Sequence, residues 1–294
     1  MTDVNPFRLT RPNLLVIVVA LVFVPACGLR EKADPADKVS MESRLQRVKR
    51  TRILRVGYGG YPPYLVKGSK SGEVSGMSVD MINRIVAIWN RDLQIQWIET
   101  SWDRVMVDFK ADKFDVIVEP LFRTIARASE LNFTRPYTYS GYGVAVIRTN
   151  DTRFRTIQDF NQAPVTVAVT QSSSSDDFVR RVLPKVQLRS LPTGNLEQPL
   201  LEVMLGRSDA AFSDVPTVTR FLGTHGSQVK ALFYDNPPVL VGAGFMIPQG
   251  DYPWASFLNV AIDFLETTGE LKELSEKYHV PYYETVLRRS AKSQ

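Results

Sequence analysis

The chain has 294 residues, of which 44% are hydrophobic and 23% charged, so it can bury one large domain or two small ones. Its net charge of +5 is mild, and its basic residues are scattered without the dense runs that follow a nucleic-acid backbone, which argues against nucleic-acid binding. The two histidines, His225 and His279, lie far apart, and Cys27 is the single cysteine. No zinc-type spacing exists, and we expect no metal and no cofactor.

The N-terminal segment resembles an export signal. Two arginines precede an unbroken apolar run over 14–24, whose eleven residues suit a signal-peptide core but are too few to span a bilayer. The residues that follow, 24–28 (VPACG), resemble a bacterial lipobox, from whose usual pattern Pro25 departs. We therefore expect acylation of Cys27. Two or more acyl chains would attach the protein stably to a membrane. The alternative is a short core helix with a buried free cysteine.

Strand and helix patterns alternate after a charged, proline-containing stretch at 28–41 and a short helix expected at 42–50. Strands are predicted at 53–58, 93–98, 115–119, 165–169, 186–191, 210–214 and 229–234. Helices are predicted at 79–89, around 102–109, and at 176–183, 196–206, 216–222, 255–265 and 271–278. This alternation predicts an α/β fold with mostly parallel sheets.

A set of motifs, in order and spacing, is similar to one protein family. The motifs are Leu54-Arg-Val-Gly57, Tyr61-Pro-Pro-Tyr64, Gly76-Met-Ser-Val-Asp80, Lys113-Phe-Asp-Val-Ile117, Thr124-Ile-Ala-Arg127, Phe133-Thr-Arg-Pro-Tyr137, the segment 165–173 and the segment 206–214. No single motif is specific, but the ordered set resembles the periplasmic polar-amino-acid binding proteins, family 3 of the extracellular solute-binding proteins. The likeness extends from about residue 45 to 280.

This resemblance implies a two-lobed periplasmic-binding-protein type II (Venus-flytrap) fold with two crossover hinge strands, which we place near 143–148 and 241–247. The expected division is a signal peptide at 1–26, a membrane tether at 27–44, lobe one at 45–146 and 243–294, and lobe two at 147–242.

Two charged residues match ligand-binding positions of the family. Arg127 matches the arginine that clamps the ligand carboxylate, and a planar guanidinium can donate two parallel hydrogen bonds to such a group. Asp214 matches the carboxylate that receives the ligand ammonium. The structural alternatives are a surface arginine in a first helical turn and an aspartate that caps the helix before Pro216.

Four further residues match the family's ligand-binding turn and its aromatic wall. Ser173 and Ser174 lie at a strand-to-helix turn, where hydroxyls and free backbone N–H groups can receive a carboxylate. Tyr61 and Trp102 match aromatics that stack on the ligand. A helix cap and core packing are the alternative roles for these two pairs.

Glu119, followed by Pro120, departs from the family, because many relatives carry small polar residues in this segment. A carboxylate here would bind an additional positive charge of the ligand or change the ligand class. The alternative is a side chain that faces solvent. Phe122 also replaces a small polar residue and makes this wall more apolar.

The function implied is a lipid-anchored binding protein on the extracytoplasmic face of the cell envelope. It would capture an amino acid or similar small zwitterion by hinge closure and deliver it to a membrane permease of the ABC type. We expect a monomer without enzymatic activity.

Two other functions stay open. Some cyclohexadienyl dehydratases share the fold, and the contexts of 100–102 and 154–157 are similar to theirs, but their catalytic glutamate is replaced by Asp176, which is one methylene shorter. The second is a solute sensor or envelope binding module without a transport role. Such a module also occurs in membrane-bound lytic transglycosylases.

Overall fold

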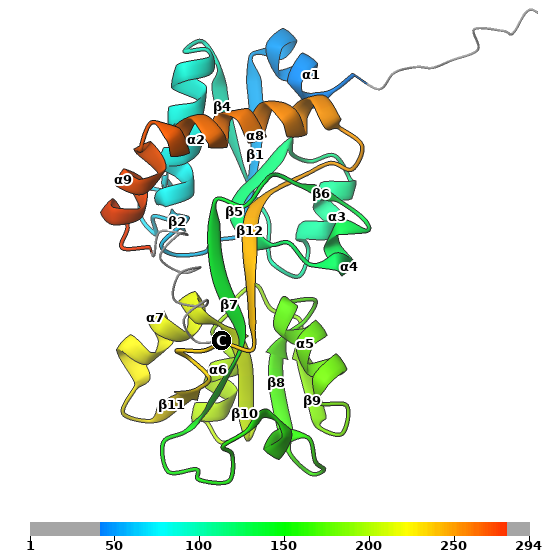
Figure 1. Ribbon diagram of the computed structural model, residues 1–294, viewed down its shortest axis with the longest axis vertical. Helices are drawn as coiled ribbons and strands as arrows, with labels where there is room; N and C mark the ends of the chain where they lie inside the picture. The colour runs from blue at the N-terminus through cyan, green and yellow to red at the C-terminus, as the bar shows by residue number, and fades with distance from the viewer. Residues whose placement is uncertain (1–41, 281–294) are drawn as a thin grey trace, which may run out of the picture. The chain divides into compact units, whose positions relative to one another are not determined.

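The computed structural model describes residues 42–280, which belong to one compact unit of the chain. Cys27, the export signal and nearly all of the tether lie outside the described residues, so what we expect of them stays a prediction. Within the described part, helices alternate with strands, and eight strands follow one another in a single hydrogen-bonded path, β4-β1-β5-β12-β7-β10-β8-β9 (Figure 1). The expected α/β class is confirmed.

The first lobe, as we call the elements around β1, has three parallel strands at its centre. β1 lies between β4 and β5, and Gly57 is opposite Ile98 on one side and Ile117 on the other. Its elements are α1 (Arg44–Thr51), β1 (Ile53–Tyr58), β2 (Val66–Lys67), β3 (Val74–Ser75), α2 (Met77–Trp89), β4 (Gln94–Glu99), α3 (Val105–Lys110), β5 (Val116–Phe122), α4 (Ile125–Ala128), β6 (Asn132–Phe133), α8 (Tyr252–Thr267) and α9 (Glu270–Lys277).

Two long antiparallel strands, β7 (Thr138–Arg148) and β12 (Val239–Ile247), join the two groups of elements (Figure 1). β12 pairs with β5, and β7 pairs with β10. These are the expected crossover strands, and both begin earlier in the chain than the sequence indicated. The sheet is therefore parallel within each lobe's β-α-β units and antiparallel where β7 or β12 takes part.

The second lobe, as we call the elements around β8, repeats the arrangement with β8 between β9 and β10, both parallel to it. Its elements are η1 (Ile157–Phe160), β8 (Thr166–Thr170), α5 (Ser174–Val182), β9 (Gln187–Leu191), α6 (Gln198–Met204), β10 (Ala210–Asp214), α7 (Val215–His225) and β11 (Val229–Leu232).

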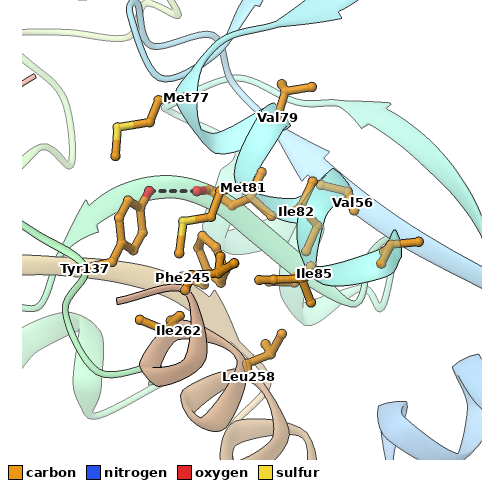
Figure 2. Packing of buried hydrophobic residues seen from close by; sticks show 14 of the residues in the cluster. Val56, Met77, Val79, Met81, Ile82, Ile85, Tyr137, Phe245, Leu258 and Ile262 are labelled. Carbon is orange, nitrogen blue, oxygen red and sulfur yellow. Dashed lines mark hydrogen bonds between the residues drawn. The ribbon is translucent and has the colours of Figure 1, made fainter. Parts of the chain in front are cut away.

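The first lobe's core forms where α2 and α8 cover the sheet. The apolar residues of α2 recur with helical spacing, and Met81, Ile82 and Ile85 pack with Leu258 and Ile262 of α8 (Figure 2). One polar contact lies within this core, because Ser78 Oγ lies 3.1 Å from the Tyr137 hydroxyl, which also donates to the carbonyl of Val118 at 2.9 Å. The buried hydroxyls are thus hydrogen-bonded, as buried polar groups require.

No helix within residues 42–280 has the length and apolar character needed to cross a membrane. In the same part of the chain, no cluster of His, Cys, Asp and Glu side chains could hold a metal ion. The lobe boundaries at 146–147 and 242–243 stay predictions. They fall inside or next to β7 and β12, which belong to both lobes through their pairing.

Candidate functional site

A narrow cavity of about 50 Å³ lies between residues of both lobes, at the carboxyl ends of their parallel strands. The loop after β1, Trp102, the end of β5 and α4 line it on the first lobe. The turn after β8 and the end of β10 line it on the second. Strand ends meet at one edge in an α/β sheet, which is why residues far apart in sequence converge here.

Tyr61 and Asp214 meet across this cavity. The Tyr61 hydroxyl donates to Asp214 Oδ1 at 2.9 Å. Asp214 ends β10 and caps α7, where the same oxygen accepts the N–H of Thr217 at 2.9 Å. Burial raises the pKa of Asp214, and burial together with the nearby Asp214 charge raises the pKa of Tyr61. Asp214 therefore caps α7 and lines the cavity, while its role as the receptor of a ligand ammonium stays a prediction.

Arg127 is a cation without an acidic partner. It lies in α4, whose first turn is capped by Thr124, and its Nη1 donates to the carbonyl of Phe122 at 3.2 Å. Its side chain lines the cavity and forms no ion pair with any carboxylate among residues 42–280. Burial lowers the pKa of Arg127, but a guanidinium stays charged in a protein. The cavity therefore contains a positive charge that an anion would neutralise.

The serine turn supplies a second receptor for an anion. Ser172 has a φ of 60°, which turns the chain from β8 into α5, and Ser173 caps this helix by accepting the N–H of Asp176 at 3.1 Å. Ser174 lines the cavity, and its buried hydroxyl has no hydrogen-bond partner. A buried hydroxyl is rarely left unpaired, so Ser174 is free to bind a ligand at a helix N-terminus.

Aromatic rings form the wall beside Tyr61. Trp102 lies edge-on to Tyr61 with ring centroids 5.6 Å apart, and its indole N–H donates to the carbonyl of Gly60 at 3.1 Å. Trp102 precedes α3 rather than lying inside it. Phe122 lines the cavity and packs against Tyr142 at 5.3 Å, so the apolar wall expected from its sequence position is present.

Glu119 lies behind this wall. It is fully buried in β5, and its Oε2 accepts the N–H of Gly59 at 2.8 Å, while its Oε1 has no partner. Burial raises the pKa of Glu119 to about 8, against the opposing effect of the Gly59 and Gly60 amides. The side chain does not face solvent, and it is not among the residues that line the cavity. A direct ligand contact of Glu119 stays a prediction.

Asp176, the residue at the catalytic position of the dehydratases, is also turned away. Its Oδ2 accepts the Ser172 N–H and the Ser190 hydroxyl, both at 3.0 Å, and its Oδ1 accepts Arg180 Nε at 2.9 Å. The cavity lining runs from Thr170 to Ser175 and does not include it. Asp176 therefore stabilises the start of α5.

Sequence reasoning did not select Thr170 and Ser213 for the site, yet both line the cavity. Each is a hydroxyl residue in the last positions of a strand that a helix follows. That position was a usable signal, because such strand ends face the crevice of an open α/β sheet.

The two lobes, the paired crossover strands and the cavity at the strand ends define a periplasmic-binding-protein fold of type II. The model of the bacterial extracellular solute-binding proteins, family 3, matches residues 54–281, and the chain belongs to this family. An ancestral amino-acid-binding protein, a precursor of cyclohexadienyl dehydratase, has the same fold, with a TM-score of 0.70 and 24% identity over 80% of this chain and 99% of that one.

Relatives include a binding protein and an enzyme. A probable amino-acid ABC transporter-binding protein of Haemophilus influenzae is 27% identical over 230 residues, which are 78% of this chain and 85% of the relative. The cyclohexadienyl dehydratase of Pseudomonas aeruginosa is 24% identical over 241 residues, which are 81% of this chain and 87% of the enzyme. The family is thus that of extracellular binding proteins, and the chemistry of the site must decide between binding and catalysis.

Proposed function

We propose that this protein captures an α-amino acid in the cleft between its lobes and delivers it to an ABC-type permease. The observation that carries the proposal is Arg127, a partly buried cation that lines the cavity and forms no ion pair with a carboxylate of residues 42–280. A charge in such a place is costly unless a ligand supplies the opposite charge. The names of the relatives, which include an amino-acid-binding protein and a transporter-binding protein, support this ligand class.

In this mechanism the two ends of the amino acid are held from opposite lobes. Arg127 of the first lobe and Ser174 with the N-terminus of α5 bind the carboxylate. Asp214 of the second lobe binds the ammonium, in competition with the hydroxyl of Tyr61 that it accepts in this structure. The rings of Tyr61 and Trp102 contact the side chain of the ligand.

Hinge closure about β7 and β12 brings these groups together. Closure excludes water, and each charged contact becomes stronger in the drier cleft. The permease would recognise the closed form, and the acyl chains on Cys27 would keep the protein at the membrane surface.

Catalysis is the second candidate, and the geometry favours binding. A general acid must reach the substrate, whereas Asp176 does not line the cavity and both of its carboxylate oxygens accept hydrogen bonds within the protein. We therefore propose a binding protein that is not an enzyme.

Substitution of Arg127 and Asp214 tests the proposal. A thermal-shift screen of the standard amino acids should find a ligand that raises the melting temperature, because ligands that bind the native state stabilise it. Arg127→Ala and Asp214→Ala should each weaken this ligand by roughly 30-fold to several-thousand-fold in calorimetric titration, which corresponds to about 2–5 kcal/mol for an unpaired buried charge.

Two exposed residues of the same types, an arginine near Arg127 in sequence and a second aspartate, provide matched controls. Arg123→Ala and Asp235→Ala remove the same charges at positions that do not line the cavity, and they should bind like the wild type. If no amino acid binds, or if Arg127→Ala retains affinity within about threefold, the proposed ligand class is wrong.

A further inference from the structure

Glu119 lies at the point where the parallel ladder between β1 and β5 ends. The register pairs Val56 with Val116 and Gly57 with Ile117, and its continuation brings Gly59 beside Glu119. β12 pairs with β5 along its opposite edge and does not extend the pairing on the side of β1. The Gly59 N–H therefore has no strand partner on that side, and the Glu119 carboxyl group accepts it at 2.8 Å.

The loop that begins at Gly59 is held from two directions. Glu119 binds the amides of Gly59 and Gly60, and Trp102 donates to the carbonyl of Gly60 at 3.1 Å. Gly60 adopts a φ of 79°, which glycine tolerates best, and a Cβ at Gly59 would lie 3.3 Å from the Trp102 ring. The loop is thus fixed between a carboxyl group and an indole, and the next residue is Tyr61.

We propose that Glu119 is a positioning residue, which holds the Gly59–Tyr61 loop so that the Tyr61 ring lies against the ligand and its hydroxyl reaches Asp214. This inference rests on the proposed function for the ligand, but the placement of Tyr61 can be tested without one. The hydrogen bonding of this buried carboxyl group supports it, because Oε2 accepts the loop amide of Gly59 and Oε1 has no partner elsewhere among the described residues. If the carboxyl group only filled space in the core, an apolar side chain could replace it without loss of stability.

Burial and the loop amides of Gly59 and Gly60 determine the pKa of Glu119. The charge of Glu119 acts on the Tyr58 hydroxyl of β1 and the Tyr137 hydroxyl before β7, and burial is the larger cause that raises the pKa of both. Neither ionises near neutral pH. The pKa of Glu119, raised to about 8, means that its charge and the strength of its bond to Gly59 change between pH 7 and 9.

Backbone amide signals of the ligand-free protein test the positioning directly. In the wild type, the Gly59 proton resonance should shift with a midpoint near pH 8, and in Glu119→Gln it should stay constant from pH 6 to 9. Glu119→Leu should shift the amides of Gly59 and also of Thr217, which donates to Asp214 in the other lobe. An unchanged Gly59 or Thr217 amide signal in Glu119→Leu would overturn the inference.

Ligand titration at pH 6.5 then separates positioning from direct contact. Glu119→Gln keeps an acceptor for Gly59 and should bind within about threefold of the wild type, whereas Glu119→Leu should lose about tenfold or more. A loss in Glu119→Gln that is much larger for L-arginine than for L-glutamine would instead indicate a direct charge contact. Asp108→Asn, a buried carboxyl bound to Thr100 and Lys113 outside the cavity, is the matched control and should bind normally. If no amino acid binds the wild type, the proposed function fails, while the amide signals still decide on positioning.

Discussion

At the scale of single residues, two ionisable groups that line the cavity and one buried near its wall form no ion pair in the described part of the chain. Arg127, Asp214 and Glu119 each lie where burial disfavours the charged form, so the pKa of the arginine is lowered and those of both acids are raised. Unpaired charge costs stability in the free protein. Under the proposed function, a zwitterionic ligand would remove this cost for Arg127 and Asp214, which line the cavity, whereas Glu119 is not among the lining residues.

The raised pKa of Glu119 makes folding stability depend on pH. In the fold the pKa is about 8, against an ordinary value of 4.5, so the native state holds a proton that the unfolded chain has released between these values. Stability contributed by this proton is complete below pH 4.5 and is lost as the pH rises through 8, at about 1.4 kcal/mol per pH unit. The free energy of unfolding of the wild type should therefore fall more steeply from pH 5 to 8 than that of Glu119→Gln.

Urea denaturation at several pH values measures this difference directly. Asp214→Asn serves as a comparison, because the pKa of Asp214 is also raised by burial and its contribution has the same sign. Parallel curves for the wild type and Glu119→Gln would mean that Glu119 is ionised in the native state at ordinary pH.

The sequence could predict that a residue faces the cavity only where its position in a strand determines the direction of its side chain. Asp214 ends a strand and precedes Val215-Pro216, so a cap facing the crevice could be predicted before the structure was known. Glu119 could not be placed, because all seven residues of β5 are buried and show no alternation between apolar and polar positions.

At the scale of elements, the helices and strands of both β-α-β units were predicted, whereas the crossover strands were predicted only in part. α2 has an apolar stripe of helical period, and β10 has a buried run of matching length, so both were recognised. β7 begins at Thr138, earlier than expected, because Gly141 and Gly143 weaken the strand pattern. Non-local pairing with β12 stabilises that part of β7, and no local pattern reports such pairing.

The hydrogen bonds of Asp176 in helix α5 lead to a prediction about catalysis. Because Asp176 accepts three hydrogen bonds that hold the start of α5, the purified protein should not convert prephenate or arogenate above background. Product formation can be followed spectroscopically. Asp176→Ala should lower the melting temperature, whereas Asp177→Ala, an exposed neighbour in the same helical turn, should leave it unchanged. Turnover that disappears in Asp176→Ala but not in Asp177→Ala would identify the protein as an enzyme.

At the scale of the whole molecule, the paired strands β7 and β12 are the elements that the two lobes share in the sheet of residues 42–280. The Tyr61–Asp214 hydrogen bond is a further link between the lobes, and it uses the carboxylate that the ligand ammonium would need. Ligand binding would therefore exchange one link across the cleft for another. Under the proposed function, the affinity would be lower for a ligand whose amine can neither displace the Tyr61 hydroxyl from Asp214 nor share Asp214 with it.

The expected membrane anchor rests on one residue outside the described part of the chain, Cys27. A permease meets its binding protein more often when both are confined to one surface, because tethering raises the effective concentration. Attachment requires at least two acyl chains, since one chain alone binds a membrane only marginally.

Substitution of this cysteine tests the anchor. In a bacterial host, the wild type should fractionate with membranes, and mass spectrometry of its N-terminal peptide should show a Cys27 that carries acyl groups. Cys27→Ser removes the thiol and should leave the protein either in the soluble fraction or as an uncleaved precursor. Ser40→Ala, a change in the stretch between Cys27 and the folded unit, should leave the fractionation unchanged. Ligand affinity should be the same in all three proteins, because the cavity is built from residues of the folded unit. An unmodified Cys27 in the mature wild-type protein would refute the anchor and leave the proposed binding function intact.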